Sequence, residues 1–166
     1  MESALNDLFV AVRGIAPQTV TELPSSGSNR RYFRLSGAQN GDSLIGVVGT
    51  SKEENSAFIY MSRHFHEKGL PVPEVLAVSP DGMSYVQTDL GDTLLFQSIE
   101  KGRLTRSFSS DEKELLTKTI RRLPDVQFVG AQGMDFSVCY PVKSFDERSI
   151  MWDLNYFKYC FLLSLI

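Results

Sequence analysis

A single helical segment interrupts a series of short strand-like segments in the first ninety residues, and this order limits the folds that the chain can adopt. Apolar residues at helical spacing over 52–67 are followed by Gly69 and Pro71, which end the helix. An amphipathic helix is also expected over 2–13. The sequence therefore predicts an α+β fold with the order helix, three strands, helix, two strands. The strands are expected over 19–23, 30–35, 43–48, 74–79 and 84–88.

The chain changes character after the fifth strand, where helix and loop replace the strands. Ser109 and Glu112 have the spacing of a capping box, which predicts the start of a helix. The segment 145–166 is rich in large apolar residues, so we expect it to form a helix that is buried against another part of the protein. Two domains follow from this change, a mixed α/β lobe over 1–90 and a mostly helical continuation over 91–166.

Composition and charge exclude several classes of protein. An apolar content of 42% in 166 residues is ample for a hydrophobic core. The net charge of -3, with both signs spread along the chain, gives no long-range field for nucleic acid or an anionic membrane. No apolar run approaches the ~20 residues of a membrane span, and the first residues do not resemble a secretory signal. We therefore expect a cytoplasmic protein that binds neither nucleic acid nor membranes.

The two cysteines, Cys139 and Cys160, lie among aromatic residues without the spacing of a metal site. We expect them to be buried thiols. The only histidines, His64 and His66, lie two positions apart on a predicted helix and so point to different faces, which argues against a metal pair. We interpret both histidines as partly solvated residues near a helix end.

The residues from Gly27 to Arg31 run from a glycine turn into a strand and combine two features that phosphate groups need. Small residues allow backbone N–H groups to approach a polyphosphate closely, and arginine neutralises its charge. Taken alone, the segment fits an ordinary hairpin turn with solvated arginines better. Strand alternation places Arg30 and Arg31 on opposite faces, so only one of them can face a nucleotide. The sequence does not select which one.

Three segments occur in a fixed order, namely 27–34 (GSNRRYFR), 69–76 (GLPVPEVL) and 89–94 (DLGDTL). Together they resemble the aminoglycoside phosphotransferase and choline kinase-like family, and the first looks most like the branch that phosphorylates amino sugars. The resemblance runs over nearly the whole chain. It implies a protein-kinase-like N-lobe, which is a five-stranded antiparallel sheet with an inserted helix, followed by a truncated, mostly helical start of a C-lobe. The family transfers the γ-phosphoryl group of ATP or GTP, with Mg²⁺, to a hydroxyl of a small molecule such as a sugar or aminoglycoside.

The resemblance also implies a nucleotide site. In such a site small residues and an arginine contact the phosphates, backbone groups of the hinge between the lobes contact the base edge, and apolar side chains enclose the base. The residues assigned in this way are Gly27, Ser28, Asn29 and either Arg30 or Arg31 at the phosphates, Thr88 as acceptor and Leu90 as donor at the base edge, and Ile45, Val47 and Val72 as apolar walls.

The third strand departs from the family pattern. Kinase-like folds place a lysine there to hold the phosphates, but the segment 43–48 contains none, and the nearest lysine is Lys52. The usual glutamate partner of that lysine would be Glu53 or Glu54, at the start of the helix. Either an arginine of the second strand substitutes for the lysine, or the affinity for nucleotide is weak.

The catalytic apparatus of the family is missing from these residues. Phosphoryl transfer needs a catalytic aspartate in a His-x-Asp loop, yet neither His64 nor His66 is followed by an aspartate at that spacing. The triplet 89–91 resembles a magnesium-binding DFG motif, but no catalytic loop precedes it, and its place after the fifth strand favours a hinge. We therefore assign no catalytic residue and no metal ligand to this chain.

Three hypotheses for the function follow. The first is the N-terminal part of a small-molecule kinase, inactive alone, whose uncharged apolar end at 160–166 favours self-association. The second is a standalone nucleotide-binding or protein-interaction module without catalysis. The third is a structural hairpin domain without a ligand.

Overall fold

The computed structural model describes residues 2–24, 29–37 and 43–165. Its chain divides into two compact units, unit 1 over 1–134 and unit 2 over 135–166, and each is described by itself. The sequence predicted a boundary at residue 90, between a mixed lobe and a helical continuation. That boundary does not coincide with the division at residue 134, and it stays a prediction.

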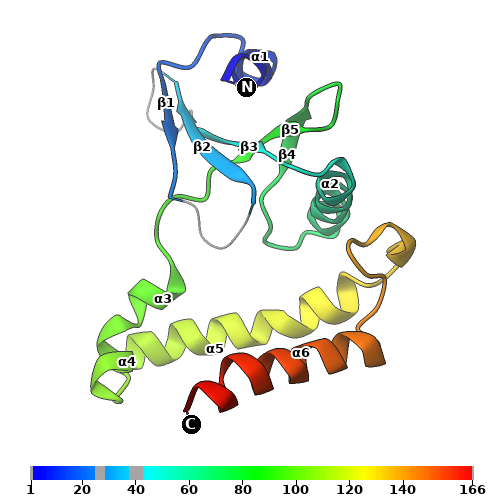
Figure 1. Ribbon diagram of the computed structural model, residues 1–166. Coiled ribbons are helices and arrows are strands. Elements are labelled where there is room, and N and C mark those ends of the chain that lie inside the picture. The colour runs from blue at the N-terminus through cyan, green and yellow to red at the C-terminus, as the bar shows by residue number, and fades with distance from the viewer. Residues whose placement is uncertain (1, 25–28, 38–42, 166) are drawn as a thin grey trace. The chain divides into compact units, whose positions relative to one another are not determined.

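Unit 1 is built on a five-stranded antiparallel sheet with the order β1-β2-β3-β5-β4 (Figure 1). The α+β class is confirmed, and so is the predicted order of three strands, a helix and two strands. β1 and β4 form the two edges of the sheet. The strands are β1 (Thr19–Glu22), β2 (Arg31–Ser36), β3 (Leu44–Val48), β4 (Val75–Val78) and β5 (Ser84–Thr88).

Two helices lie on opposite faces of this sheet, α1 (Glu2–Arg13) and α2 (Lys52–Glu67). Their bounds agree with the two predicted helices of this region. Ser51 caps α2 by accepting a hydrogen bond from the Glu54 N–H at 3.2 Å. Because side chains alternate along each strand, every strand contributes to both faces. The α1 face contains Leu5, Leu8, Phe9, Phe33, Leu35, Leu44 and Val86, and the α2 face contains Ile45, Val47, Ile59, Val75 and Tyr85.

The rest of unit 1 is helical. Short helices α3 (Leu95–Ser98) and α4 (Glu100–Thr105) precede the longer α5 (Ser110–Pro124), which continues into one π-helical turn, η1 (Asp125–Val129). The predicted capping box begins α5: the Ser109 Oγ accepts from the Glu112 N–H, and a Glu112 carboxylate oxygen accepts from the Ser109 N–H at 2.8 Å.

Unit 2 consists of the turn η2 (Phe136–Val138), helix α6 (Glu147–Cys160) and the short η3 (Leu162–Leu165). The sequence correctly predicted a helix in this segment, but the expectation that its apolar side chains are buried is wrong. Trp152 is 73% exposed and Tyr156 is 66% exposed. Only about thirty residues belong to this unit, too few to enclose a core of their own.

The expected burial of the cysteines is also wrong. Cys139 is partly exposed, Cys160 is exposed, and no disulfide joins them. Both lie in unit 2, whose side chains are mostly in contact with solvent. Within the described ranges, no helix has both the length and the apolar character needed to cross a membrane.

Candidate functional site

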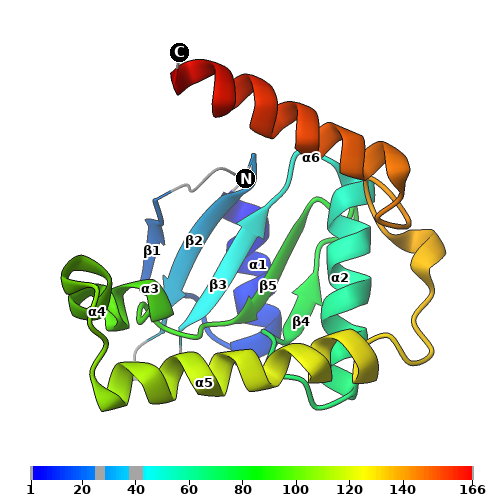
Figure 2. The same cartoon turned by 90° about the horizontal axis from the view of Figure 1, so that it is seen from below.

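The α2 face of the sheet carries two rows of side chains that run across the strands. Tyr32, Val47 and Tyr85 are opposite one another in the first row, and Arg34, Ile45 and Gln87 are opposite one another in the second. Figure 2 shows α2 beside β4, at the opposite edge of the sheet from β1. Side-chain exposure on this face rises with distance from α2, from β5 towards β2. Tyr85 and Val47 are fully buried, whereas Tyr32 and Arg34 are only half-buried.

Arg30 directly precedes β2 and binds α2. Its Nη2 is 3.0 Å from the Glu54 Oε1 and donates a hydrogen bond to the Glu54 carbonyl oxygen at 3.3 Å. The guanidinium carbon lies 5.0 Å from the centre of the Phe58 ring, and that ring stacks on Tyr85 at 5.4 Å. With 9% of its surface exposed, Arg30 is a buried cation that is held by a carboxylate.

Tyr85 lies in this cluster as a neutral phenol. Burial raises its pKa above the ordinary value, while the nearby Arg30 guanidinium acts in the opposite direction and does not offset the burial. The phenol therefore remains protonated over the physiological range of pH.

Arg31 lies on the other face of the sheet. It forms a two-pronged ion pair with Glu22, with Nε to Oε1 at 2.7 Å and Nη2 to Oε2 at 2.8 Å. Its guanidinium also lies over the ring of Phe33, which belongs to the α1 core. The hydrogen bond from Arg31 lowers the pKa of Glu22. Alternation along β2 thus separates the two neighbouring arginines, and only Arg30 reaches the α2 face.

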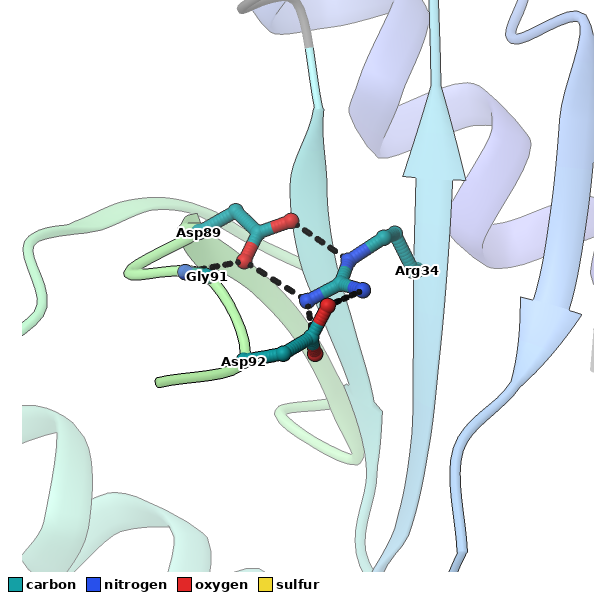
Figure 3. Close-up of polar contacts among 4 residues, drawn as sticks. All are labelled: Arg34, Asp89, Gly91 and Asp92. Carbon is teal, nitrogen blue, oxygen red and sulfur yellow. Dashed lines mark hydrogen bonds and ion pairs between the residues drawn. The ribbon is translucent and has the colours of Figure 1, made fainter. Parts of the chain in front are cut away.

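Arg34, in the second row, binds two carboxylates beyond the end of β5 (Figure 3). Its Nε and Nη2 donate to the two oxygens of Asp89 at 2.6 and 3.1 Å, and its Nη1 and Nη2 donate to those of Asp92 at 2.8 Å each. The Asp89 side chain is only 7% exposed, whereas that of Asp92 is 80% exposed. The sequence did not reveal this network, because its partners lie 55 and 58 positions apart.

The charges of this network change the pKa values of its members. Burial alone would raise the pKa of Asp89, but hydrogen bonds from Arg34, from the Gly91 N–H and from Ser43 outweigh it and hold the pKa below its ordinary value. The hydrogen bond from Arg34 likewise lowers the pKa of Asp92. The two carboxylates raise the pKa of Arg34, so all three groups are charged at neutral pH.

The predicted hinge residues lie at the end of β5. The Thr88 N–H donates to the Glu74 carbonyl oxygen at 3.0 Å, and the Thr88 Oγ1 accepts from the Glu74 N–H at 3.0 Å. Leu90 is 70% exposed, and its N–H has no hydrogen-bond partner among the described residues. This N–H is therefore a donor that a ligand could use.

The other residues that were assigned to the nucleotide site differ in their exposure to solvent. Gly27 and Ser28 lie outside the described residues, and Asn29 is exposed. Ile45 and Val47 share the α2 face with Arg30, although both are almost completely buried. Val72 is half-buried in the segment that leads to β4.

The histidines near the end of α2 have structural contacts. His64 Nε2 lies 2.8 Å from the Gly130 carbonyl oxygen, and His66 Nε2 lies 3.8 Å from the Glu74 carboxylate. In the part of the chain that the structure describes, no group of three or more His, Cys, Asp or Glu side chains could hold a metal ion. No model of a known protein family and no curated protein matches this chain.

Proposed function

We propose that unit 1 binds a purine nucleotide on the α2 face of its sheet, as the kinase-like nucleotide lobe of a small-molecule phosphotransferase of the aminoglycoside phosphotransferase and choline kinase-like type. The nucleotide is ATP or GTP with Mg²⁺, and the acceptor of the complete reaction is a sugar or aminoglycoside. These 166 residues contain no His-x-Asp loop, so we expect the chain to bind nucleotide without transferring phosphate.

The observation that carries this proposal is the ion pair between the buried Arg30 and the partly exposed Glu54. The third strand lacks the lysine that a kinase-like site uses, and Arg30 places a cation on the same face, fixed by a glutamate from the first turn of α2. A guanidinium suits this role because its planar donors can bind a carboxylate and a phosphate at once. Arg30 also directly follows the small residues that are assigned to the phosphates.

We place the base at the other end of the strands from Arg30, where the hinge follows β5. Ile45 is opposite Gln87, and Gln87 comes shortly before the hinge residues Thr88 and Leu90. The Leu90 N–H is available for a hydrogen bond to the base. Recognition through a backbone donor would not distinguish ATP from GTP, so both nucleotides are candidates.

Calorimetry with ATP, ADP and GTP tests the proposal. For the wild type we expect saturable binding, and for Arg30→Ala a dissociation constant at least about tenfold higher, because a hydrogen bond to a charged group contributes roughly 1.5–3 kcal/mol. Arg31→Ala is the matched comparison, since Arg31 lies on the α1 face, and we expect less than about a threefold change. Arg30→Lys keeps a charge beside Glu54 and should give an intermediate value.

Two outcomes would contradict the proposal. Absence of saturable heat from the wild type with every nucleotide would leave the structural domain without a ligand as the better hypothesis. Equal losses in Arg30→Ala and Arg31→Ala would refute the assignment of Arg30. Incubation with ATP, Mg²⁺ and amino sugars is a separate test, because turnover by this chain would show that it has a catalytic apparatus which we have not identified.

The exposed aromatic side chains of α6 favour the alternative, a protein-interaction module that includes self-association. Phe157 and Phe161 stack at 5.2 Å while both remain half exposed to solvent. Sedimentation of the wild type and of Trp152→Ser distinguishes this function, since a monomer at every concentration would argue against self-association.

A further inference from the structure

Arg34 joins β2 to the segment that follows β5, and this contact has no role in the function proposed above. We propose that Arg34 is a positioning residue: it fixes the turn over 89–91 so that the Leu90 N–H is held ready to donate a hydrogen bond to the edge of a nucleobase. This inference rests on the proposed nucleotide function and adds to it the feature that determines how tightly the base is held.

The geometry of the contact makes it a rigid connection. All four donor–acceptor distances between Arg34 and the carboxylates of Asp89 and Asp92 lie between 2.6 and 3.1 Å. A guanidinium is planar, so two carboxylates bound along its edges are held in a defined orientation (Figure 3). The Asp89 side chain is 7% exposed, which protects its ion pair from the solvent screening that weakens surface pairs.

The same aspartate also organises the turn. The Asp89 Oδ1 accepts both the Arg34 Nη2, at 3.1 Å, and the Gly91 N–H, at 2.9 Å. A side-chain oxygen that binds the N–H two residues later forms an Asx turn. Gly91 completes this turn with a φ of 78°, a conformation that glycine adopts without a steric penalty.

The turn leaves one backbone donor for a ligand. The Gly91 N–H is bound by Asp89, and the Thr88 N–H is bound by the Glu74 carbonyl. By contrast, within the described ranges the Leu90 N–H is bound by nothing, and 70% of the Leu90 surface is exposed. Arg34 therefore orders the residues on both sides of the available donor.

A donor that is already ordered binds more tightly than one that must be ordered on binding. The loss of backbone freedom is then complete before the ligand arrives and no longer opposes the association. Ile45 is opposite Arg34 in the sheet and was assigned to the wall of the base site, so the connection reaches the turn from the side where the base would lie. Loss of Arg34 should weaken contacts to the base and leave those to the phosphates unchanged.

Backbone ¹⁵N relaxation of Leu90 and Gly91 measures the first part of this inference without any ligand. In the wild type we expect order parameters near the rigid value of about 0.85, and in Arg34→Gln a fall to below about 0.6. Arg122→Gln is the matched control, because it breaks the exposed ion pair between Arg122 of α5 and Asp125 of η1 and should leave both order parameters unchanged. Unchanged order parameters in a folded Arg34→Gln variant would overturn the inference.

Titration with ATP and with adenosine measures the second part. Arg34→Gln should raise both dissociation constants by the same factor, about tenfold, which corresponds to ordering roughly one backbone residue on binding. Arg30→Ala, in contrast, should weaken ATP and leave adenosine unaffected. If Arg34→Gln loses order at Leu90 but keeps its affinity for both ligands, Arg34 does not position the donor.

The proposed function and this inference can fail separately. A wild type that binds neither ATP nor adenosine overturns the nucleotide function together with the ligand-related part of the inference, whereas the order parameters decide on their own whether Arg34 fixes the turn. Should Arg34→Gln fail to fold, Arg34→Lys carries the same test. A lysine keeps the charge beside Asp89 but cannot hold both carboxylates in one plane, so a smaller loss of order and affinity in the same pattern is expected.

Discussion

Two arginines of β2, Arg31 and Arg34, form ion pairs of the same chemical type in different surroundings, and their energies should differ accordingly. Each donates two hydrogen bonds to one carboxylate, Arg31 to Glu22 and Arg34 to Asp89. The side chains of the first pair are 48% and 49% exposed, and those of the second are 23% and 7% exposed. Double-mutant cycles on the two pairs would measure the effect of burial within one strand.

The expected magnitudes follow from these exposures. An exposed ion pair contributes about 0–1 kcal/mol, because water screens it and both side chains lose freedom. Removal of Arg34 leaves the Asp89 carboxylate buried without its cation, which should cost about 2–3 kcal/mol. We therefore expect a coupling energy of about 2 kcal/mol between Arg34→Gln and Asp89→Asn, and about 0.5 kcal/mol between Arg31→Gln and Glu22→Gln.

The pH dependence gives an independent check on the same pair. The pKa of Asp89 is lower in the folded protein than in the unfolded chain, so its ionised form stabilises the fold. This stabilisation is complete above the unfolded pKa of about 3.9 and is lost as the pH falls through the lower folded pKa. The stability difference between wild type and Asp89→Asn should thus be constant near neutrality and decline only below about pH 4.

The assay must report on the sheet. The single tryptophan, Trp152, lies in α6 of unit 2, so its fluorescence is not a direct probe of the sheet in unit 1. Urea titrations followed by NMR signals of buried sheet residues such as Val86 avoid this difficulty. A coupling energy for Arg34 and Asp89 no larger than that of the exposed pair, or a coupling that persists unchanged at pH 2, would refute the reasoning.

Two further predictions concern the core of unit 1. Phe9→Ala should reduce the free energy of unfolding by about 3–5 kcal/mol, since Phe9 is fully buried between α1 and the sheet, while Val10→Ala, at a position that is 41% exposed, should change it by less than about 0.5 kcal/mol in the same urea titration. Gly49→Ala should cost about 1–3 kcal/mol, because a Cβ there would overlap the buried amide of Asn55, which donates to the Gly82 and Met83 carbonyls. A melting temperature of Gly49→Ala equal to that of the wild type would contradict this account.

Local sequence patterns determined much of the architecture. The periods of α1 and α2 and the capping box of α5 each act over a few residues, and the structure confirms them. The same local reasoning failed for α6, since an apolar composition indicates a need for burial but does not state what is available to cover the helix.

Alternation along β2 was also readable in advance, so the sequence alone determined that Arg30 and Arg31 would lie on opposite faces. Only the tertiary structure decided which of them meets α2, because that depends on the side of the sheet on which the helix packs. The partners of Arg34 were decided in the same way. Pairing of β2 with β3 and of β3 with β5 brings together residues that are 55 positions apart in the chain, and no local pattern encodes that distance.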